Sequence, residues 1–141
     1  MIRWSLLGRI LRHPLPRVTA ALGWTVLVCL LMLLPGKDSI AEDTSGFFGG
    51  TDITDAFGHV LLFAMLTVLW YAALTCWLAP APALKAVLAI GTVFGLLLEL
   101  GQGVVPERGI SLLDFAANAL GVLAATVLLT AQSGLRREQP R

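Results

Sequence analysis

The chain has 141 residues, of which 57% are apolar, and a formal net charge of +1. This apolar fraction is well above that of soluble domains and indicates a membrane protein of one domain, while the near-neutral charge offers no basic surface for nucleic acid. Cys29 and Cys76 lie inside apolar runs, where a thiol acts as a small hydrophobic side chain, so they indicate neither a disulfide framework nor a metal motif.

Residues 1–17 form a basic amphipathic segment before the first apolar run. In IRWSLLGRILR the arginines Arg9 and Arg12 lie opposite an apolar helical face, which consists of Ile2, Leu6, Leu7, Ile10 and Leu11. This pattern predicts a helix that lies on the cytoplasmic leaflet of the membrane. An unstructured basic tail is the alternative interpretation.

Four apolar runs follow, at 18–34, 56–78, 83–105 and 112–131. Each is close to the roughly 20 residues that a helix needs to cross a hydrocarbon core of ~30 Å. Because continuous apolar runs differ from the alternating pattern of a membrane β-barrel, we predict an all-α polytopic protein with four transmembrane helices in a compact bundle over 18–131. Residues 132–141 are expected to form an unstructured cytoplasmic tail. A signal peptide is the alternative for the first run, although three spans would then separate the two basic tails.

Basic residues predict the orientation of these spans. Lys85 lies in the short loop between the second and third runs, the 36–55 loop is acidic, and arginines occupy both tails, at Arg3, Arg9, Arg12, Arg17, Arg136, Arg137 and Arg141. Since Lys and Arg are enriched on the cytoplasmic side, we expect both termini in the cytoplasm and the 36–55 and 106–109 loops outside.

Polar residues of three spans are expected to meet near the outer boundary of the membrane. The set comprises Asp55, His59, Glu99, Gln102, Asp114 and Asn118. The first pair opens the second span, the next pair closes the third, and the last pair opens the fourth, so each pair lies within about one helical turn of the outside. Charges and amides are costly in a bilayer unless they pair, reach water or carry a function, so this convergence predicts a polar site.

In this order the polar residues resemble the pattern of the VanZ-like membrane proteins. That pattern has an Asp and a His opening one span, then Glu-x-x-Gln, an Arg, a Ser, an Asp and Asn-x-x-Gly. The matching residues are Asp55, His59, Glu99, Gln102, Arg108, Ser111, Asp114, Asn118 and Gly121. The resemblance covers roughly 55–121 and implies a small multi-pass protein of the bacterial cytoplasmic membrane, in a family named for a member associated with reduced teicoplanin susceptibility. At Phe63 the chain departs from the tyrosine that often follows the histidine, so the hydroxyl is missing.

Structural roles are the alternative for several of these residues near the fourth span. Ser111-Leu112-Leu113-Asp114 fits a capping box, in which Ser111 accepts a hydrogen bond from a backbone N–H and Asp114 returns one. Arg108 suits lipid headgroups, which it can reach by snorkelling, or a carboxylate or phosphate held by its planar fork. Asp114 can cap the helix and face the polar site at once.

The buried positions also have structural interpretations. His59 can pair with Asp55, and Gln102 and Asn118 can join helices through hydrogen bonds. Gly121 belongs to a row of small residues spaced by four, which favours close helix packing. Glu99 is the hardest residue to explain in this way, because a carboxylate below the interface needs a partner or a proton.

Three functions fit the predicted site. In the first, it recognises an amphipathic ligand at the outer leaflet, such as a lipid-linked cell-wall precursor, a lipoglycopeptide or a phospholipid headgroup. The ligand-binding residues would be Asp55, His59, Glu99, Gln102, Arg108, Asp114 and Asn118. A polar head and a lipid tail would match a polar cluster that borders a hydrocarbon core.

In the second function the site is catalytic and acts on a lipid phosphate. His59 beside Asp55 would be a general base, Glu99 and Asp114 would be acids or metal ligands, and Arg108 would stabilise charge. A metal held by His, Asp, Glu or Asn side chains stays open, although no compact ligand motif indicates one, and no cofactor is expected. In the third function the polar set only holds the helices together and a partner protein carries the activity. Each is compatible with a homo-oligomer.

Overall fold

The computed structural model describes residues 13–34, 52–106 and 108–137, and within them the chain is all-helical. The helices are α2 (Pro14–Leu33), α4 (Asp52–Leu74), α5 (Pro80–Gln102) and α6 (Leu112–Arg137). All four are long and apolar enough to cross a membrane, which confirms the predicted four-span fold. The amphipathic helix expected over 1–17 falls mostly on 1–12, which lie outside the described residues.

α2 begins at Pro14, four residues before the expected start of the first span. A proline suits the first turn of a helix, because the N–H that it lacks would have no intrahelical partner there. His13 caps this end, since its Nδ1 accepts from the backbone N–H of Leu15 at 3.4 Å. Residues 14–17, expected in the interfacial segment, therefore belong to the spanning helix.

The boundary between α4 and α5 also differs from the expected one. α4 ends at Leu74 instead of 78, and Thr75 to Leu78 close tight turns onto its last carbonyls. Pro80 forces the preceding Ala79 into an extended conformation (φ −61°, ψ 155°), so the chain reverses there. α5 then begins at Pro80, three residues earlier than expected, because its prolines occupy the helix start.

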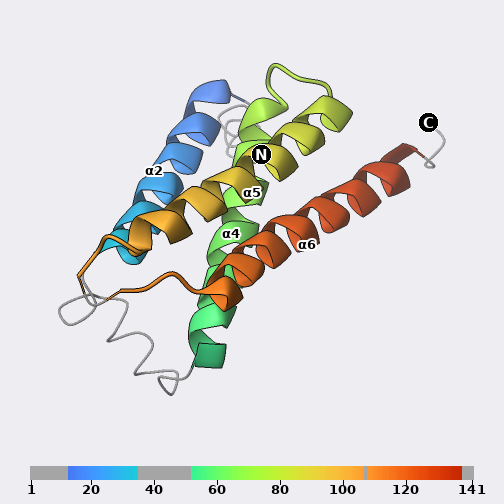
Figure 1. Ribbon diagram of the computed structural model, residues 1–141. Helices are drawn as coiled ribbons and strands as arrows, with labels where there is room; N and C mark the ends of the chain where they lie inside the picture. Colours follow the sequence, from blue (N-terminus) through green and yellow to red (C-terminus); the bar gives the residue numbers. More distant parts are fainter. Residues whose placement is uncertain (1–12, 35–51, 107, 138–141) are drawn as a thin grey trace.

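α6 extends beyond the expected end of the fourth span at 131 and continues to Arg137. The prediction of an unstructured tail from 132 is therefore wrong for 132–137, which are helical although Gly134 disfavours a helix, because no proline interrupts them and Gln, Leu and Arg favour the helix. Figure 1 shows the end of α6 leaving the other helices. A helix of 26 residues is about 39 Å long, so its last turns exceed a hydrocarbon core of ~30 Å.

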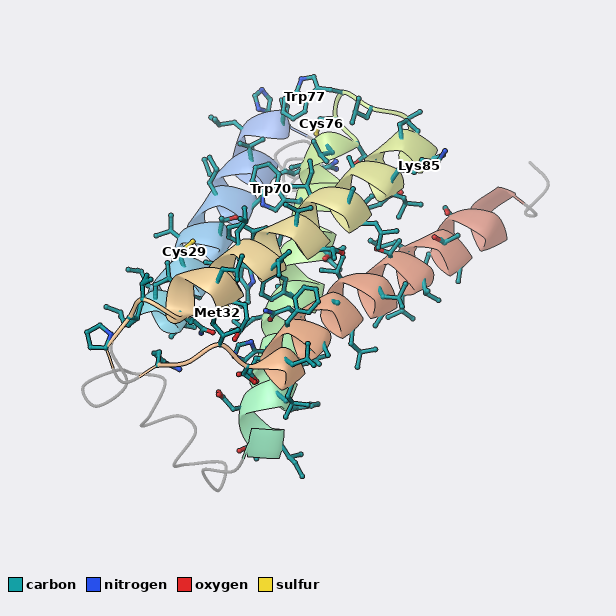
Figure 2. All side chains as sticks on the ribbon, viewed as in Figure 1. Cys29, Met32, Trp70, Cys76, Trp77 and Lys85 are labelled. Atoms are coloured by element: carbon teal, nitrogen blue, oxygen red, sulfur yellow. The ribbon has the colours of Figure 1, made fainter. Side chains whose placement is uncertain are left out.

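α4 lies at the centre of the bundle and packs against α2, α5 and α6 (Figure 1). The buried apolar core comprises Val28, Met32, Phe63, Leu66, Leu98 and Val122, with Trp24, Cys29, Leu62, Trp70 and Phe94 packed against it. Large apolar side chains elsewhere on all four helices are exposed and suit contact with lipid, as many side chains projecting from the bundle show (Figure 2).

Two indole groups attach α2 to α4 by hydrogen bonds. Trp24 Nε1 donates to the carbonyl of Leu62 at 3.0 Å, and Trp70 Nε1 donates to Oγ1 of Thr25 at 3.0 Å. Inside a bilayer such donors have no water to bond, so pairing them fixes how the two helices face each other.

Gly121 sets the closest approach of α6 to α4. A Cβ atom at this position would overlap the carbonyl oxygen of Val60 and lie 3.1 Å from the backbone nitrogen of Ala64. Small residues let membrane helices pack backbone to backbone. Val60 directly follows His59 on α4, and Gly121 lies one turn from Asn118 on α6, so this contact positions both of those side chains.

Candidate functional site

α2 and α5 end, and α4 and α6 begin, at one end of the bundle, which we call the polar end (Figure 1). Four polar side chains there are at most 5% exposed: His59, Glu99, Gln102 and Asn118. Asp55 and Asp114 are half-buried. The opposite end carries the α4–α5 loop, near which Cys76, Trp77 and Lys85 lie (Figure 2). Buried polar groups are costly without partners, so the hydrogen bonds of each residue show its role.

His59 is held by Asn118 and not by Asp55. Its Nδ1 donates to Oδ1 of Asn118 at 2.9 Å, across the α4–α6 contact. Because an amide oxygen only accepts, Nδ1 carries the hydrogen and Nε2 of a neutral ring keeps its lone pair. Gly95 of α5 packs against Asn118, and a Cβ atom on Gly95 would lie 3.1 Å from that of Asn118. The imidazole therefore has a fixed orientation and one free nitrogen.

Glu99 ties α5 to the start of α6. Its Oε1 accepts from the backbone N–H of Ser111, while its Oε2 is buried without a hydrogen-bond partner. Ser111 Oγ accepts from the backbone N–H of Asp114 at 3.2 Å and so caps α6. In the capping box that the sequence predicted, Asp114 would return a bond to Ser111, but Glu99 takes that bond. The carboxylate of Asp114 is thereby left for other contacts.

Asp55, His59 and Asp114 face one small space between α4 and α6. One ligand atom of each lies within 4.8 Å of the ligand atoms of the other two. Neither a hydrogen bond nor an ion pair joins the three groups directly in the part of the chain that the structure describes. Both aspartates lie in the first turn of their helices, where the helix dipole favours negative charge.

Gln102 and Arg108 contact α2 and lie apart from this group. Gln102 Nε2 donates to the carbonyl of Met32 at 3.0 Å. Arg108 donates through Nε to Leu34 at 3.4 Å and through Nη2 to Leu31 at 3.5 Å. Carbonyls in the last turn of a helix have no intrahelical partner, so these side chains satisfy the end of α2. Among the described residues, the hydrogen-bond partners of the Arg108 guanidinium are main-chain carbonyls and not carboxylates.

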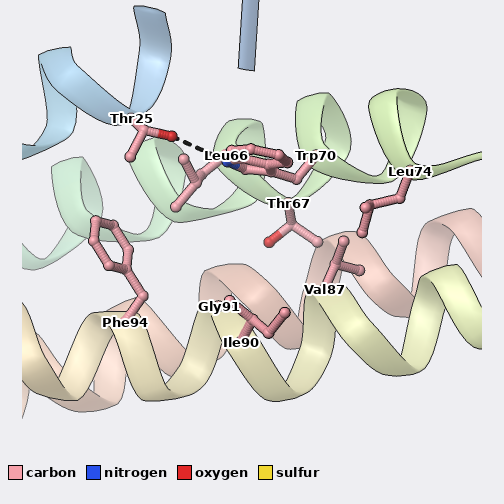
Figure 3. Close-up of a pocket in the computed structure, with 9 residues that line it drawn as sticks. All are labelled: Thr25, Leu66, Thr67, Trp70, Leu74, Val87, Ile90, Gly91 and Phe94. Carbon is pink, nitrogen blue, oxygen red and sulfur yellow. Dashed lines mark hydrogen bonds between the residues drawn. The ribbon is translucent and has the colours of Figure 1, made fainter. Parts of the chain in front are cut away.

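An apolar cavity of about 310 Å³ lies between α2, α4 and α5, nearer the middle of the bundle (Figure 3). It is lined by Thr25, Leu66, Thr67, Trp70, Leu74, Val87, Ile90, Gly91 and Phe94. The hydroxyl of Thr67 donates to the carbonyl of Phe63, so the lining offers little free hydrogen bonding. A second hollow, of about 630 Å³, lies between Tyr71 of α4 and Gln132 of α6, towards the opposite end.

Sequence patterns did not predict the cavity or the contacts with α2. The partners Gln102 and Met32 are 70 positions apart, and a main-chain carbonyl has no sequence signature. The expected convergence of three spans already placed Asp55, His59 and Asp114 in one polar set, but the sequence did not single these three out from the larger set. The spacing of four between the first two was the available signal.

The chain matched no family model, and comparison with curated proteins and with solved structures found no similar protein. The site must therefore be interpreted from its own geometry.

Proposed function

We propose that this chain is a VanZ-like protein of the bacterial inner membrane that binds the polar head of an amphipathic envelope ligand at its polar end. The observation that carries the proposal is the pair of buried, unpartnered atoms, Glu99 Oε2 and Asn118 Nδ2. Leaving one such group unsatisfied costs about 1–3 kcal/mol. A ligand that donates to Glu99 and accepts from Asn118 would recover that cost.

The apolar cavity supports a ligand with a lipid tail. Phe94 lines the cavity and packs against Phe63, with ring centroids 6.2 Å apart. Phe63 in turn lies beside Gly95, which contacts Asn118 of the polar cluster. Polar groups and an apolar cavity thus occupy successive layers of the bundle. A ligand with a hydrogen-bonding head and an acyl chain could place its head among the polar groups and its chain in the apolar cavity.

The distribution of charge supports an outer position for the polar end. Arg17 and Lys85 lie towards the opposite end, and basic residues are enriched on the cytoplasmic side of membranes. In this orientation the polar end meets the outer leaflet, where lipid-linked cell-wall precursors and lipoglycopeptides are present. The family resemblance adds teicoplanin-type glycopeptides as the first ligands to test.

The test compares bacteria with and without the protein for growth in a lipidated and in a non-lipidated glycopeptide. We expect a larger shift for the lipidated drug, lost in Glu99→Gln although the variant is inserted at normal abundance. Thr92→Val is the control, because Thr92 lies on the same helix, is half-buried, and its hydroxyl donates to Leu88 of its own helix. Equal shifts for both drugs would show that the lipid tail does not contribute to recognition. No shift for either drug would contradict the glycopeptide connection.

A membrane-embedded hydrolase or transferase is the second candidate, favoured by the grouping of Asp55, His59 and Asp114. His59 has a fixed ring and a free nitrogen, as a general base needs. It would take a proton from a water molecule that attacks a lipid phosphate, and the imidazolium would return the proton to the departing lipid oxygen, which leaves as the alcohol. Purified protein in vesicles of labelled lipid-linked phosphate would then release the headgroup, and His59→Gln would abolish the release.

A further inference from the structure

We propose that Asp55, His59 and Asp114 bind one divalent transition-metal ion of the Zn²⁺ or Mn²⁺ class. Their ligand atoms lie within 4.8 Å of one another, yet no direct hydrogen bond or ion pair joins them among the described residues. A tetrahedral ion with bonds of about 2.0–2.2 Å separates its ligand atoms by about 3.3–3.6 Å. Shortening the distances between the ligand atoms by no more than about 1.5 Å, which side-chain rotation can provide, would let all three bind one ion.

The backbone already holds the ligands in place. Asp55 and His59 are four residues apart on α4 and so share one face of the helix. Asp114 comes from the first turn of α6, and the close contact at Gly121 holds α6 against α4. Ligands on two rigid helices in direct contact need little reorganisation to bind an ion.

Asn118 gives the histidine the support that a metal ligand needs. Metal-binding histidines usually have their second ring nitrogen fixed by a hydrogen bond, which sets the tautomer and the ring orientation. Here Nδ1 donates to Asn118, whose side chain is 1% exposed, and Nε2 is the nitrogen with a free lone pair. This bond leaves Nε2 oriented and available, as expected of a metal ligand.

Charge supplies an independent reason for a cation. Glu99 is 2% exposed, has an unpartnered Oε2, and interacts electrostatically with Asp114, His59 and Asp55. Arg108, in the α5–α6 loop, donates to carbonyls of α2. Two aspartates beside one imidazole, with the carboxyl group of Glu99 close by, are costly at the edge of a bilayer. A dication would neutralise the two aspartates and attract the free oxygen of Glu99.

The donor set favours a transition metal over Mg²⁺ or Ca²⁺. Those ions prefer six or more oxygen ligands, whereas this site offers one imidazole nitrogen and two carboxylates. Three protein ligands leave a coordination position for water or for an oxygen of a ligand. The ion could thus serve either function above, but its binding depends on neither.

Metal content can be measured on the purified full-length chain in detergent, without any envelope ligand. The protein is stripped with a chelator, incubated with Zn²⁺, Mn²⁺ or Mg²⁺, desalted and analysed for metal per chain. We expect about one Zn²⁺ or Mn²⁺ and no retained Mg²⁺, with affinity lowered about 10-fold or more in Asn118→Ala and bound metal lost in His59→Gln. His13→Gln is the matched control, because His13 is the only other histidine and caps α2.

Thermal unfolding of the wild-type chain makes the test independent of variant folding. Zn²⁺ or Mn²⁺ should raise its Tm, Mg²⁺ should not, and the increase should persist in His13→Gln and vanish in Asp114→Asn. Wild-type protein that retains no metal and shows no Tm increase would overturn the site, as would equal metal content in His59→Gln. Since no lipid or drug is present, neither result depends on whether the protein affects glycopeptide susceptibility.

Discussion

The backbone N–H of Ser111 donates to Oε1 of Glu99, so a side chain of α5 provides the hydrogen-bond acceptor for the residue directly before α6. This bond joins the end of one spanning helix to the beginning of the next across the α5–α6 loop. It also replaces the bond that Asp114 would make in a capping box, and it leaves that aspartate close to Asp55 and His59. One hydrogen bond thus both stabilises the α5–α6 loop and leaves Asp114 available to the site.

Glu99→Gln should therefore preserve the fold better than Glu99→Ala. Glutamine keeps an oxygen that accepts from Ser111, whereas alanine leaves a half-buried N–H unpaired, which costs about 1–3 kcal/mol. Thermal unfolding in detergent should show a Tm near that of the wild type for the first variant and a clear decrease for the second. Equal decreases would mean that the charge of Glu99, and not its bond to Ser111, stabilises the loop.

Gly121→Ala should destabilise the bundle by about 1–3 kcal/mol, because the added methyl overlaps the backbone of α4 at Val60. Gly23→Ala is the control, since a Cβ atom at Gly23 meets nothing within 4 Å and alanine favours a helix. The Tm of each purified variant measures the effect. If the two variants have the same Tm, α4 and α6 are not packed as closely as described.

How much of this structure the sequence could predict depends on the range of the interactions involved. The four spans follow from the length of each apolar run, and the shared polar end follows because successive spans cross the membrane in opposite directions. Both inferences need only the order of residues. The helix ends were displaced by a few residues, because prolines at Pro14 and Pro80 begin helices that hydropathy alone starts later. The partners of the site residues were less predictable, since those of His59, Glu99 and Gln102 lie outside their own helices.

Arg108 illustrates that limit. Its sequence context suggested headgroups or an anionic ligand, but the structure directs it to the carbonyls of Leu31 and Leu34. Main-chain acceptors at the end of a helix leave no mark in a sequence pattern. The same applies to Gln102 and the carbonyl of Met32.

Gln102→Ala and Arg108→Ala should loosen the end of α2, because each leaves carbonyls there unpaired. The half-buried Cys29 lies one turn earlier on α2, so its reaction with a maleimide should become faster in a Cys76→Ser background. Gln132→Ala, on the exposed surface of α6, should leave the rate unchanged. An unchanged rate in Arg108→Ala would show that Arg108 does not stabilise the end of α2, and would favour a role as a ligand clamp.

Cysteine labelling from outside the cell can test the proposed orientation. After replacement of Cys29 and Cys76, a membrane-impermeant maleimide should label Gly109→Cys, at the polar end, and spare Ala81→Cys, at the start of α5. Both positions are exposed, so accessibility within the protein is matched. The reverse pattern would place the polar end in the cytoplasm and exclude an outer-leaflet ligand.

Filling the apolar cavity should show whether the cavity binds the tail of a ligand, independently of the polar groups that bind its head. Val87→Phe adds a ring to the cavity lining, about three to four helical turns from the polar groups at the end of α5 and without changing any of them. Val93→Phe is the control, because Val93 lies on the same helix but is 56% exposed and faces away from the core. If the cavity accepts an acyl chain, Val87→Phe should reduce the shift in susceptibility to a lipidated glycopeptide, while Val93→Phe should keep it. Abundance in the membrane and Tm must match in the two variants. Equal shifts in both would show that the tail lies outside this cavity, in the bilayer itself.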